Sequence, residues 1–173
     1  MEDIYIMRAA LADKEALSDL FYSHLAGNAE YISHGEIQMG IAHLVLDGDK
    51  YVPQLDEDSR HVWLTYIIEH MTSDGMAVYK AESSCGELLG FCVLETGEDG
   101  GAPFGVLCDI LVNEKARGRG IGGRLFSAAE EWFRQKKLQD VYLESGKNNH
   151  NAHKFFMRRG FMKVSEVYHK GEK

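Results

Sequence analysis

Hydrophobic and polar positions along the chain follow two periods, and these predict the order of strands and helices. Short runs that alternate or are apolar throughout predict strands at residues 4–8, 76–81, 88–94, 104–112, 141–145 and 161–168. Apolar residues three or four positions apart predict helices at 14–26, 59–74, around 125–132 and at 151–159. The order β-α-α-β-β-β-α-β-α-β predicts an α/β fold of the α+β kind, with one mixed sheet and helices on both faces.

The stretch from residue 30 to 60 has no clear period. It holds scattered glycines, Pro53 and the acidic runs 47–49 and 56–58, and it predicts a long loop with room for one turn of helix. A polar, glycine-rich turn is predicted at 95–101. Because no repeat or change of composition divides the chain, residues 1–173 are expected to form a single domain.

Net charge, cysteine content and the lengths of the apolar runs exclude several classes of function. Nineteen Lys and Arg against 27 Asp and Glu give a net charge of −8, which argues against a basic surface for nucleic acid. The cysteines Cys85, Cys92 and Cys108 form no C-x-x-C pair, so we expect buried or inert thiols in a reducing cytoplasm. The chain shows neither a secretory leader nor an apolar run of membrane-spanning length, so no membrane partner is expected.

The most informative stretch runs from Val112 to Gly123, between the strand at 104–112 and an amphipathic helix. Glycines allow backbone N–H groups to converge on an anion at a helix N-terminus, where the helix dipole also favours negative charge. Residues 113–137 carry seven Lys and Arg against three Glu. The loop therefore predicts a phosphate-bearing ligand, with a tight turn before a solvated basic helix as the alternative.

Two other phosphate-binding motifs, the dinucleotide fingerprint and the P-loop, are alternatives for the same residues. Gly118, Gly120 and Gly123 spell G-x-G-x-x-G, and Glu144 follows about twenty residues later, as a dinucleotide fingerprint requires. However, five residues separate Val112 from Gly118, whereas the fingerprint's first glycine follows its strand almost directly. A P-loop is excluded because no Gly-Lys-Ser/Thr ends the motif.

Read as Arg117-x-x-Gly120-x-Gly122, the loop resembles the acyl-CoA pyrophosphate loop of the GCN5-related N-acetyltransferase (GNAT) superfamily. Residues 4–8 with Asp13 resemble the opening strand and helix cap of that superfamily. The segment Asn149-x-x-Ala152-x-x-Phe155-Phe156-x-x-x-Gly160-Phe161 resembles its C-terminal motif. These matches follow the superfamily's order over nearly the whole chain, with residues 30–60 outside the resemblance.

The resemblance implies a GNAT-like domain with acetyl-CoA as co-substrate. It implies that the pantetheine arm pairs with the strand at Ile110, Leu111 and Val112. It further implies that the pyrophosphate lies on a loop made of Arg117, Gly118, Arg119, Gly120, Ile121, Gly122 and Gly123. Arg119 or Arg124 would serve this group or the 3′-phosphate, and Asn149 would lie near the thiol arm.

Direct acetyl transfer to an amine needs a base, a donor to the thioester carbonyl and an acid for the leaving thiolate. Asp109 is the candidate base, because a carboxylate within an apolar strand has a raised pKa. Pairing with Arg8 or another cation, or binding the substrate ammonium, is the alternative role, and Glu144 is the reserve base. Phe156 stands where many family members have the tyrosine acid, so Tyr142, Ser145, Cys108 or water is left to protonate the thiolate.

The acceptor is predicted to be a small cationic amine, because the irregular segment carries the acidic residues Asp47, Asp49, Asp56, Glu57 and Asp58. Solvated loop charge explains these residues equally well. A protein or peptide acceptor and a non-catalytic acyl-CoA-binding module remain the alternative functions, and a homodimer is possible on the resemblance. His150 and His153 are interpreted as a surface pair, so no metal is expected.

Overall fold

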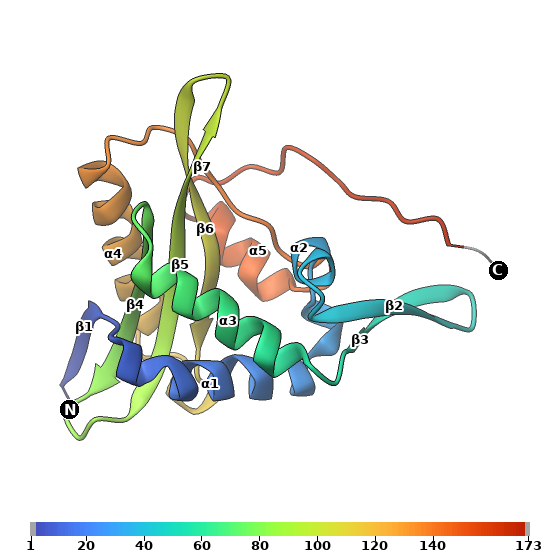
Figure 1. The fold of residues 1–173 in the computed structure, drawn as a ribbon, viewed down its shortest axis with the longest axis horizontal. Helices are drawn as coiled ribbons and strands as arrows, with labels where there is room; N and C mark the ends of the chain where they lie inside the picture. Colours follow the sequence, from blue (N-terminus) through green and yellow to red (C-terminus); the bar gives the residue numbers. More distant parts are fainter. Residues whose placement is uncertain (1–2, 172–173) are drawn as a thin grey trace.

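A computed structural model describes residues 3–171 and shows one mixed α/β body (Figure 1). Its five-stranded sheet has the order β1-β4-β5-β6-β7, antiparallel except for the parallel pair β6–β7. The strands are β1 (Ile4–Arg8), β4 (Met76–Ser83), β5 (Leu88–Asp99), β6 (Ala102–Val112) and β7 (Val141–Tyr142). The predicted mixed sheet is confirmed.

Helices cover both faces of this sheet, as predicted. They are α1 (Lys14–Gly27), α2 (His34–Gln38), α3 (Ser59–Thr72), α4 (Ile121–Gln135) and α5 (His150–Met157), with the 3₁₀ turns η1 (Leu11–Asp13), η2 (Ala29–Tyr31) and η3 (Glu114–Ala116). The apolar faces of α1 and α3 pack on one side of the sheet, where Phe21 and Trp63 stack with ring centroids 4.4 Å apart. Those of α4 and α5 pack on the other side, around Leu125 and Phe156.

The prediction of a long loop over residues 30–60 is wrong, although the single turn of helix expected within it is present as α2. The segment contains α2 and a separate two-stranded sheet, β2 (Ala42–Asp47) and β3 (Lys50–Leu55), which projects from the body (Figure 1). Asp47 pairs with Lys50, so Gly48 and Asp49 form the turn, and Gly48 has a φ of +61°. Pro53 and the acidic residues hide the alternation, because most side chains of this hairpin stay partly exposed and need not be apolar.

The predicted turn at 95–101 is also shorter than expected. Strand β5 continues to Asp99 and β6 begins at Ala102, so the turn is Gly100–Gly101, both with positive φ. These polar positions form strand because they pair across a two-stranded extension, Glu95 with Val106 through Asp99 with Ala102. Backbone pairing there does not depend on an apolar face.

Two predicted strands are reduced or missing. The strand at 141–145 keeps only Val141 and Tyr142. The run 161–168 forms no strand within the described residues, although Met162, Val164 and Tyr168 alternate and are more than three-quarters exposed. A strand requires a hydrogen-bonding partner as well as an alternating sequence.

Several local expectations can be checked directly. Asp13 lies at the start of α1, where its carboxylate accepts hydrogen bonds from the Ala10 amide and the Lys80 ammonium. All three cysteines are free thiols: Cys92 is buried, Cys108 is partly buried and Cys85 is exposed, so burial of the thiol is confirmed for Cys92 alone. No helix in the described chain has both the length and the apolar composition needed to cross a bilayer.

Candidate active site

The main sheet opens between β6 and β7. Strand β6 pairs with β5 along its whole length, but it pairs with β7 only at Gly105 and Val106. Beyond Val106, no strand of the described chain pairs with this edge of β6. Peptide groups of the following residues, which include the predicted Ile110–Val112, can therefore bind an extended ligand as an additional strand would.

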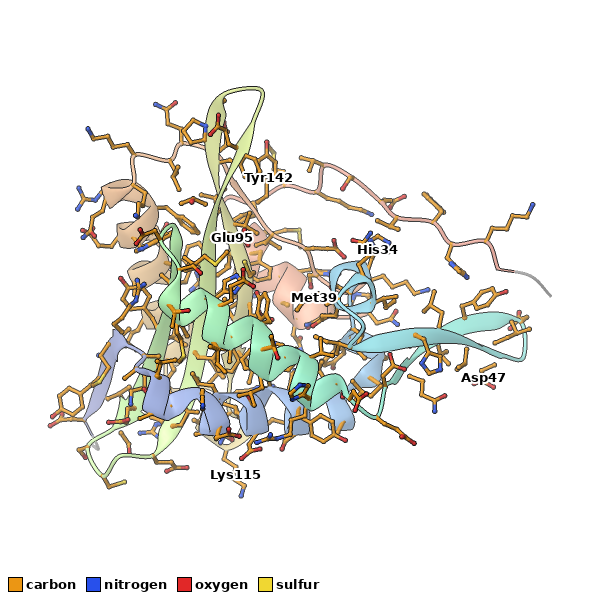
Figure 2. The ribbon with its side chains drawn as sticks, viewed as in Figure 1. His34, Met39, Asp47, Glu95, Lys115 and Tyr142 are labelled. Carbon is orange, nitrogen blue, oxygen red and sulfur yellow. The ribbon has the colours of Figure 1, made fainter. Side chains whose placement is uncertain are left out.

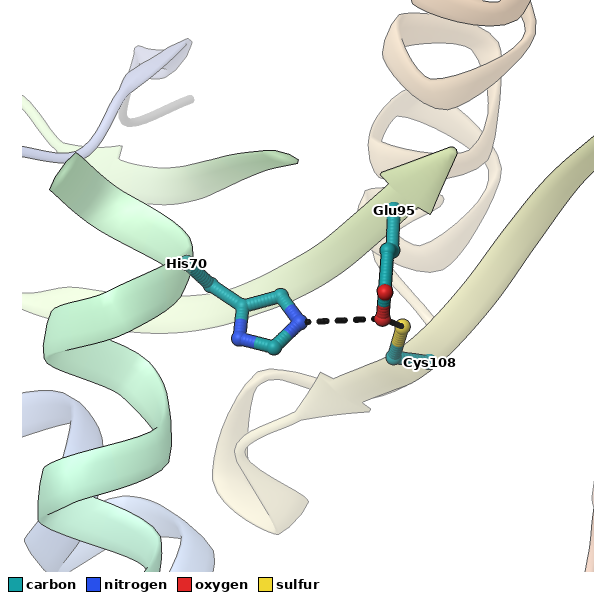
Figure 3. Close-up of side chains that lie close together, drawn as sticks. All are labelled: His70, Glu95 and Cys108. Atoms are coloured by element: carbon teal, nitrogen blue, oxygen red, sulfur yellow. Dashed lines mark hydrogen bonds and ion pairs between the residues drawn. The ribbon is translucent and has the colours of Figure 1, made fainter. Parts of the chain in front are cut away.

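A β-bulge in β6 decides which side chains face α3. Val93 pairs with Asp109 and Leu94 with Leu107, so Cys108 is the extra residue. In a regular strand Cys108 and Asp109 would point to opposite faces of the sheet. Here both lie near α3: the Tyr66 hydroxyl donates to Asp109 Oδ2 at 3.1 Å, and Cys108 lies close to His70 (Figure 3).

A cavity of about 430 Å³ lies at this opening. Its walls come from α1, α2, α3, β5, β6, the segment after β7 and α5. Apolar and aromatic groups dominate the lining, and the described carboxylates among them are Glu36, Glu95, Asp109 and Glu144. Such a cavity, with convergent acidic groups, suits a small ligand that carries positive charge.

Asp109 is the predicted base, and its surroundings disfavour the carboxylate form. Burial, helped by the nearby Glu36 carboxylate and opposed by the hydrogen bond from Tyr66, raises the pKa of Asp109 to about 7. The alternative pairing with Arg8 does not occur, because Arg8 donates to the Met76 carbonyl and lies over the Tyr79 ring. Asp109 can thus gain or lose a proton near neutral pH.

Two further carboxylates connect α2 to this cavity. Burial raises the pKa of Glu36, against the hydrogen bonds from Ser33, and the Glu144 carboxylate adds to the rise. Glu144 accepts a 2.8 Å hydrogen bond from the Gly35 amide, so it holds α2 against the segment after β7. Glu144, the reserve base, therefore has a positioning contact of its own while it lines the cavity.

The glycine loop places open backbone at the start of α4. Gly118 and Gly120 have φ of +78° and +76°, and a Cβ added to either would meet no atom within 4 Å. The positive φ, and not lack of space, requires glycine there. Because Ile121, Gly122 and Gly123 begin α4, their N–H groups have no acceptor within the helix and can bind an anion.

Two arginines near this loop, Arg117 and Arg124, already make hydrogen bonds to backbone carbonyls. Arg117 donates to the Val112 carbonyl and lies 3.6 Å from the Glu114 carboxylate, and Arg124 donates to the Ile4 carbonyl at 2.7 Å. Arg119 is exposed between its two glycines. A second cavity, of about 530 Å³, is lined by Gly120, Gly123, Arg124 and Arg159, among others.

Sequence reasoning missed Arg159. Its guanidinium lies 3.5 Å from the Phe155 ring centroid and donates to the Phe155 carbonyl at 3.0 Å. Its Nη2 is 3.2 Å from the Cβ position of Gly123, which places this cation beside the first turn of α4. The sequence feature that could have pointed to Arg159 is its position within the C-terminal motif, one residue before Gly160.

The remaining predicted residues divide into two groups. Asn149 lines the 430 Å³ cavity while its side chain caps α5 by accepting from the Ala152 amide, and Phe156 and Ser145 line this cavity as well. Tyr142 is half-exposed, packs edge-on against Phe104 and does not contribute to the lining. Tyr66 of α3 is part of the cavity wall.

The acidic residues predicted to attract the acceptor lie elsewhere. Figure 2 shows Asp47 far out on the hairpin, whereas Glu95 lies over the main sheet. None of Asp47, Asp49, Asp56, Glu57 and Asp58 lines the cavity. His153 Nε2 lies 3.0 Å from the Gly146 carbonyl oxygen, which accounts for that nitrogen as a hydrogen-bond donor.

Comparison with known proteins identifies the family to which the chain belongs. A model of the acetyltransferase (GNAT) family matches residues 43–161, and none of the curated proteins compared with the chain matches it. A provisionally named acetyl transferase from Pyrococcus furiosus is 20% identical, with coverage of 98% of this chain and 100% of that one and a TM-score of 0.71.

Two aminoglycoside acetyltransferases are also similar in structure. AAC(6′)-Iy, solved with CoA, is 17% identical over 100% of this chain and 97% of its own, with a TM-score of 0.68. AAC(6′)-Ih from Acinetobacter baumannii is 15% identical over 99% of both chains, with a TM-score of 0.64. These identities show a shared fold, and the family match, which spans more than half of the chain, shows that it belongs to the GNAT acetyltransferase family, whose co-substrate is acetyl-CoA.

Proposed function

We propose that this protein transfers the acetyl group of acetyl-CoA directly to a primary amine of a small cationic molecule. The observation that carries the proposal is the position of Asp109. Its carboxylate lies in an acidic cavity at the point where β6 and β7 separate, and the same strand leads into the glycine loop that begins α4. The acceptor side and the phosphate side of one site are thus joined by a single strand.

On the phosphate side, the first N–H groups of α4 bind the pyrophosphate, helped by the helix dipole. Arg159 and Arg124 line the neighbouring cavity and bind the 3′-phosphate. The free edge of β6 at Ile110, Leu111 and Val112 holds the pantetheine arm. Asn149 and Phe156 line the cavity beside that edge, near the thioester.

On the acceptor side, Glu36, Glu95 and Glu144 attract the cationic amine to Asp109. Asp109 accepts one proton from the ammonium, directly or through water, and the neutral nitrogen attacks the thioester carbonyl while a β6 backbone N–H stabilises its oxygen. As the C–S bond breaks and the thiolate leaves, the nitrogen loses a second proton to water, and the amide forms. Because Phe156 has no hydroxyl, Ser145, Cys108 or water returns a proton to the sulfur.

Tyr66 acts as a positioning residue for the base. Burial, with the Asp109 charge beside it, raises the pKa of Tyr66 far above its usual value, so its hydroxyl stays protonated and donates to Asp109. The hydrogen bond fixes the carboxylate and limits the rise of its pKa. The oxygen that does not bind Tyr66 is the one available to the amine.

The experiment that tests this function is mass spectrometry of a pooled amine library incubated with acetyl-CoA and the protein. The library holds polyamines, aminoglycosides, amino acids and short peptides, and Asp109→Asn is the control. A product heavier by one acetyl group, absent from the control, supports the proposal, and an acetylated peptide would favour a protein acceptor. If nothing is acetylated while acetyl-CoA still raises the melting temperature, the acyl-CoA-binding module is the correct function.

The predicted homodimer also remains a proposal. The extended segment at 161–168 leaves alternating apolar side chains, Met162, Val164 and Tyr168, exposed. A second chain that supplied a strand partner would cover them. Sedimentation of the purified protein at several concentrations tests this, and a monomer throughout the range would contradict it.

A further inference from the structure

Three side chains converge on the wall of the acceptor cavity in an arrangement that the proposed reaction does not require, since Glu95 serves there only as one of several carboxylates and Cys108 as one of three candidate proton donors. His70 comes from α3, Glu95 from β5 and Cys108 from the bulge of β6 (Figure 3). One ligand atom of each lies within 4.8 Å of the others. His70 Nε2 is 3.5 Å from Glu95 Oε2, and Cys108 Sγ is 3.9 Å from the same oxygen.

His70 is the part of this cluster that ordinary packing leaves unexplained. Its side chain is only 3% exposed, and its Nδ1 lies 2.9 Å from the Tyr66 carbonyl oxygen. A carbonyl only accepts hydrogen bonds, so in the neutral ring the proton is on Nδ1 and the Nε2 lone pair points at Glu95. Nε2 is buried without a hydrogen-bond partner in the described structure, and its 3.5 Å contact with Glu95 is an ion pair only when the ring is protonated, so in the neutral ring this lone pair requires an explanation.

We propose that His70, Glu95 and Cys108 form a binding site for one thiophilic divalent cation, with Zn²⁺ as the best fit. Imidazole nitrogen, carboxylate oxygen and thiolate are the protein ligands that Zn²⁺ prefers. Metal–ligand distances of about 2.0–2.3 Å place the ligand atoms of a tetrahedral site about 3.4–3.7 Å apart. The two separations that involve Glu95 Oε2 differ from this range by a few tenths of an ångström or less.

The surroundings support a metal-binding role for each ligand. The Tyr66 carbonyl orients His70 as the outer-shell partner of a metal-bound imidazole does. Glu95 and Cys108 line the cavity, so an ion and a fourth ligand such as water can enter from that side. On binding, the Cys108 thiol releases its proton to solvent, and the new bonds are S–Zn, N–Zn and O–Zn, without any oxidation or reduction.

Zn²⁺ itself is the probe. The chelator-treated protein is dialysed against Zn²⁺, and the bound metal is measured by mass spectrometry; Co²⁺ then replaces it for absorption spectroscopy. We expect one equivalent in the wild type and a thiolate-to-Co²⁺ charge-transfer band that Cys108→Ala removes. Glu95→Gln should weaken binding at least about tenfold, because losing a ligand costs more than losing an outer-shell partner.

Two control variants separate this site from adventitious binding. Cys85→Ser removes the exposed thiol, and the double change His150→Gln with His153→Gln removes the other histidine pair. Both should keep one equivalent of Zn²⁺. Failure of the wild type to bind, retention of the band in Cys108→Ala, or loss of binding in either control would overturn the proposal. None of these readouts uses acetyl transfer, so the metal site and the proposed function can fail separately.

If the proposed function holds, the ion also has a kinetic effect. Bound at Glu95 and Cys108, it adds positive charge to the cavity that receives the ammonium. Zn²⁺ should therefore raise the acceptor KM of the wild type and of Cys85→Ser, and a chelator should restore it. An equal rise in Cys108→Ala would place the inhibition elsewhere and contradict the shared cavity.

Discussion

Asp109→Asn is the most informative single substitution, because it keeps the size and the Tyr66 contact of the side chain but removes the proton acceptor. General base catalysis contributes about 10²- to 10⁴-fold, so kcat at pH 7 should fall by that factor. The affinity for acetyl-CoA should stay within about twofold, because the phosphate-binding N–H groups of α4 and Arg159 are untouched. Steady-state kinetics and calorimetric titration with CoA, both with a chelator present, measure the two quantities.

The pH dependence gives a second test of the same residue. Burial raises the pKa of Asp109 to about 7, so its carboxylate form, and with it kcat/KM, should rise as the pH passes through about 7. The Asn variant should lose this inflection while keeping any that belongs to the acceptor. A wild-type profile flat between about pH 5.5 and 8.5 would refute the assignment of Asp109 as the base.

Stability supplies a third test, independent of catalysis. Because the folded pKa of Asp109 lies above its ordinary value, the folded state binds more protons than the unfolded state between about pH 4 and 7, and stability falls as the pH rises through this range. At pH 8 the buried carboxylate should cost on the order of a few kcal/mol. Asp109→Asn should therefore raise the Tm at pH 8, by an amount that shrinks towards pH 4. A lower Tm at pH 8 would mean that the carboxylate stabilises the fold.

Three further substitutions test the other parts of the site. Phe156→Tyr supplies the missing acid and should raise kcat, and an unchanged or lower rate in steady-state assays would show that another group already protonates the thiolate. Arg159→Met, which keeps an apolar contact with Phe155, should raise the acetyl-CoA KM about tenfold with little change in Tm, as expected for one charge-assisted phosphate contact; an unchanged KM would exclude that contact. Gly120→Ala places an alanine in the left-handed backbone region and should lower the free energy of unfolding by about 1–2 kcal/mol, measured by chemical denaturation. Gly27→Ala, in open space at the end of α1, should not lower it. Equal effects of the two changes would show that the positive φ of Gly120 does not require glycine.

Much of the site could be predicted because its chemistry is local in sequence. Asp109, the end of its strand and the glycine loop follow one another in the sequence. They therefore lie close together whatever the arrangement of the rest of the fold. The strands at 4–8, 76–81, 88–94 and 104–112 could be predicted because each has a strong apolar or alternating signal of its own. The hairpin of β2 and β3 was missed because its pairing is made by the backbone, while Pro53 and the surrounding acids mask its alternation.

The acceptor side could not be predicted, because it is assembled from distant segments. Glu36, Tyr66, Glu95 and Asp109 come from four elements, and nothing in their spacing marks them as neighbours. Acidic composition pointed to the run at 56–58, which is more acidic in sequence but does not line the cavity. The sequence does not reveal the bulge at Cys108 either, because only the pairing register of β5 and β6 shows that Cys108 is the extra residue.

The carboxylates of the cavity act on Asp109 in two opposite ways during the proposed reaction. Without acceptor, burial raises the pKa of Asp109 to about 7, and repulsion from the Glu36 carboxylate contributes to this rise. An ammonium that enters the cavity reverses the sign of the local charge and lowers that pKa, so Asp109 becomes a carboxylate as the substrate arrives. This carboxylate then accepts one proton from the ammonium, directly or through water, before the neutral nitrogen attacks the carbonyl. The same charges that select a cationic acceptor therefore prepare the base, which ties specificity to catalysis through the electrostatics of one cavity.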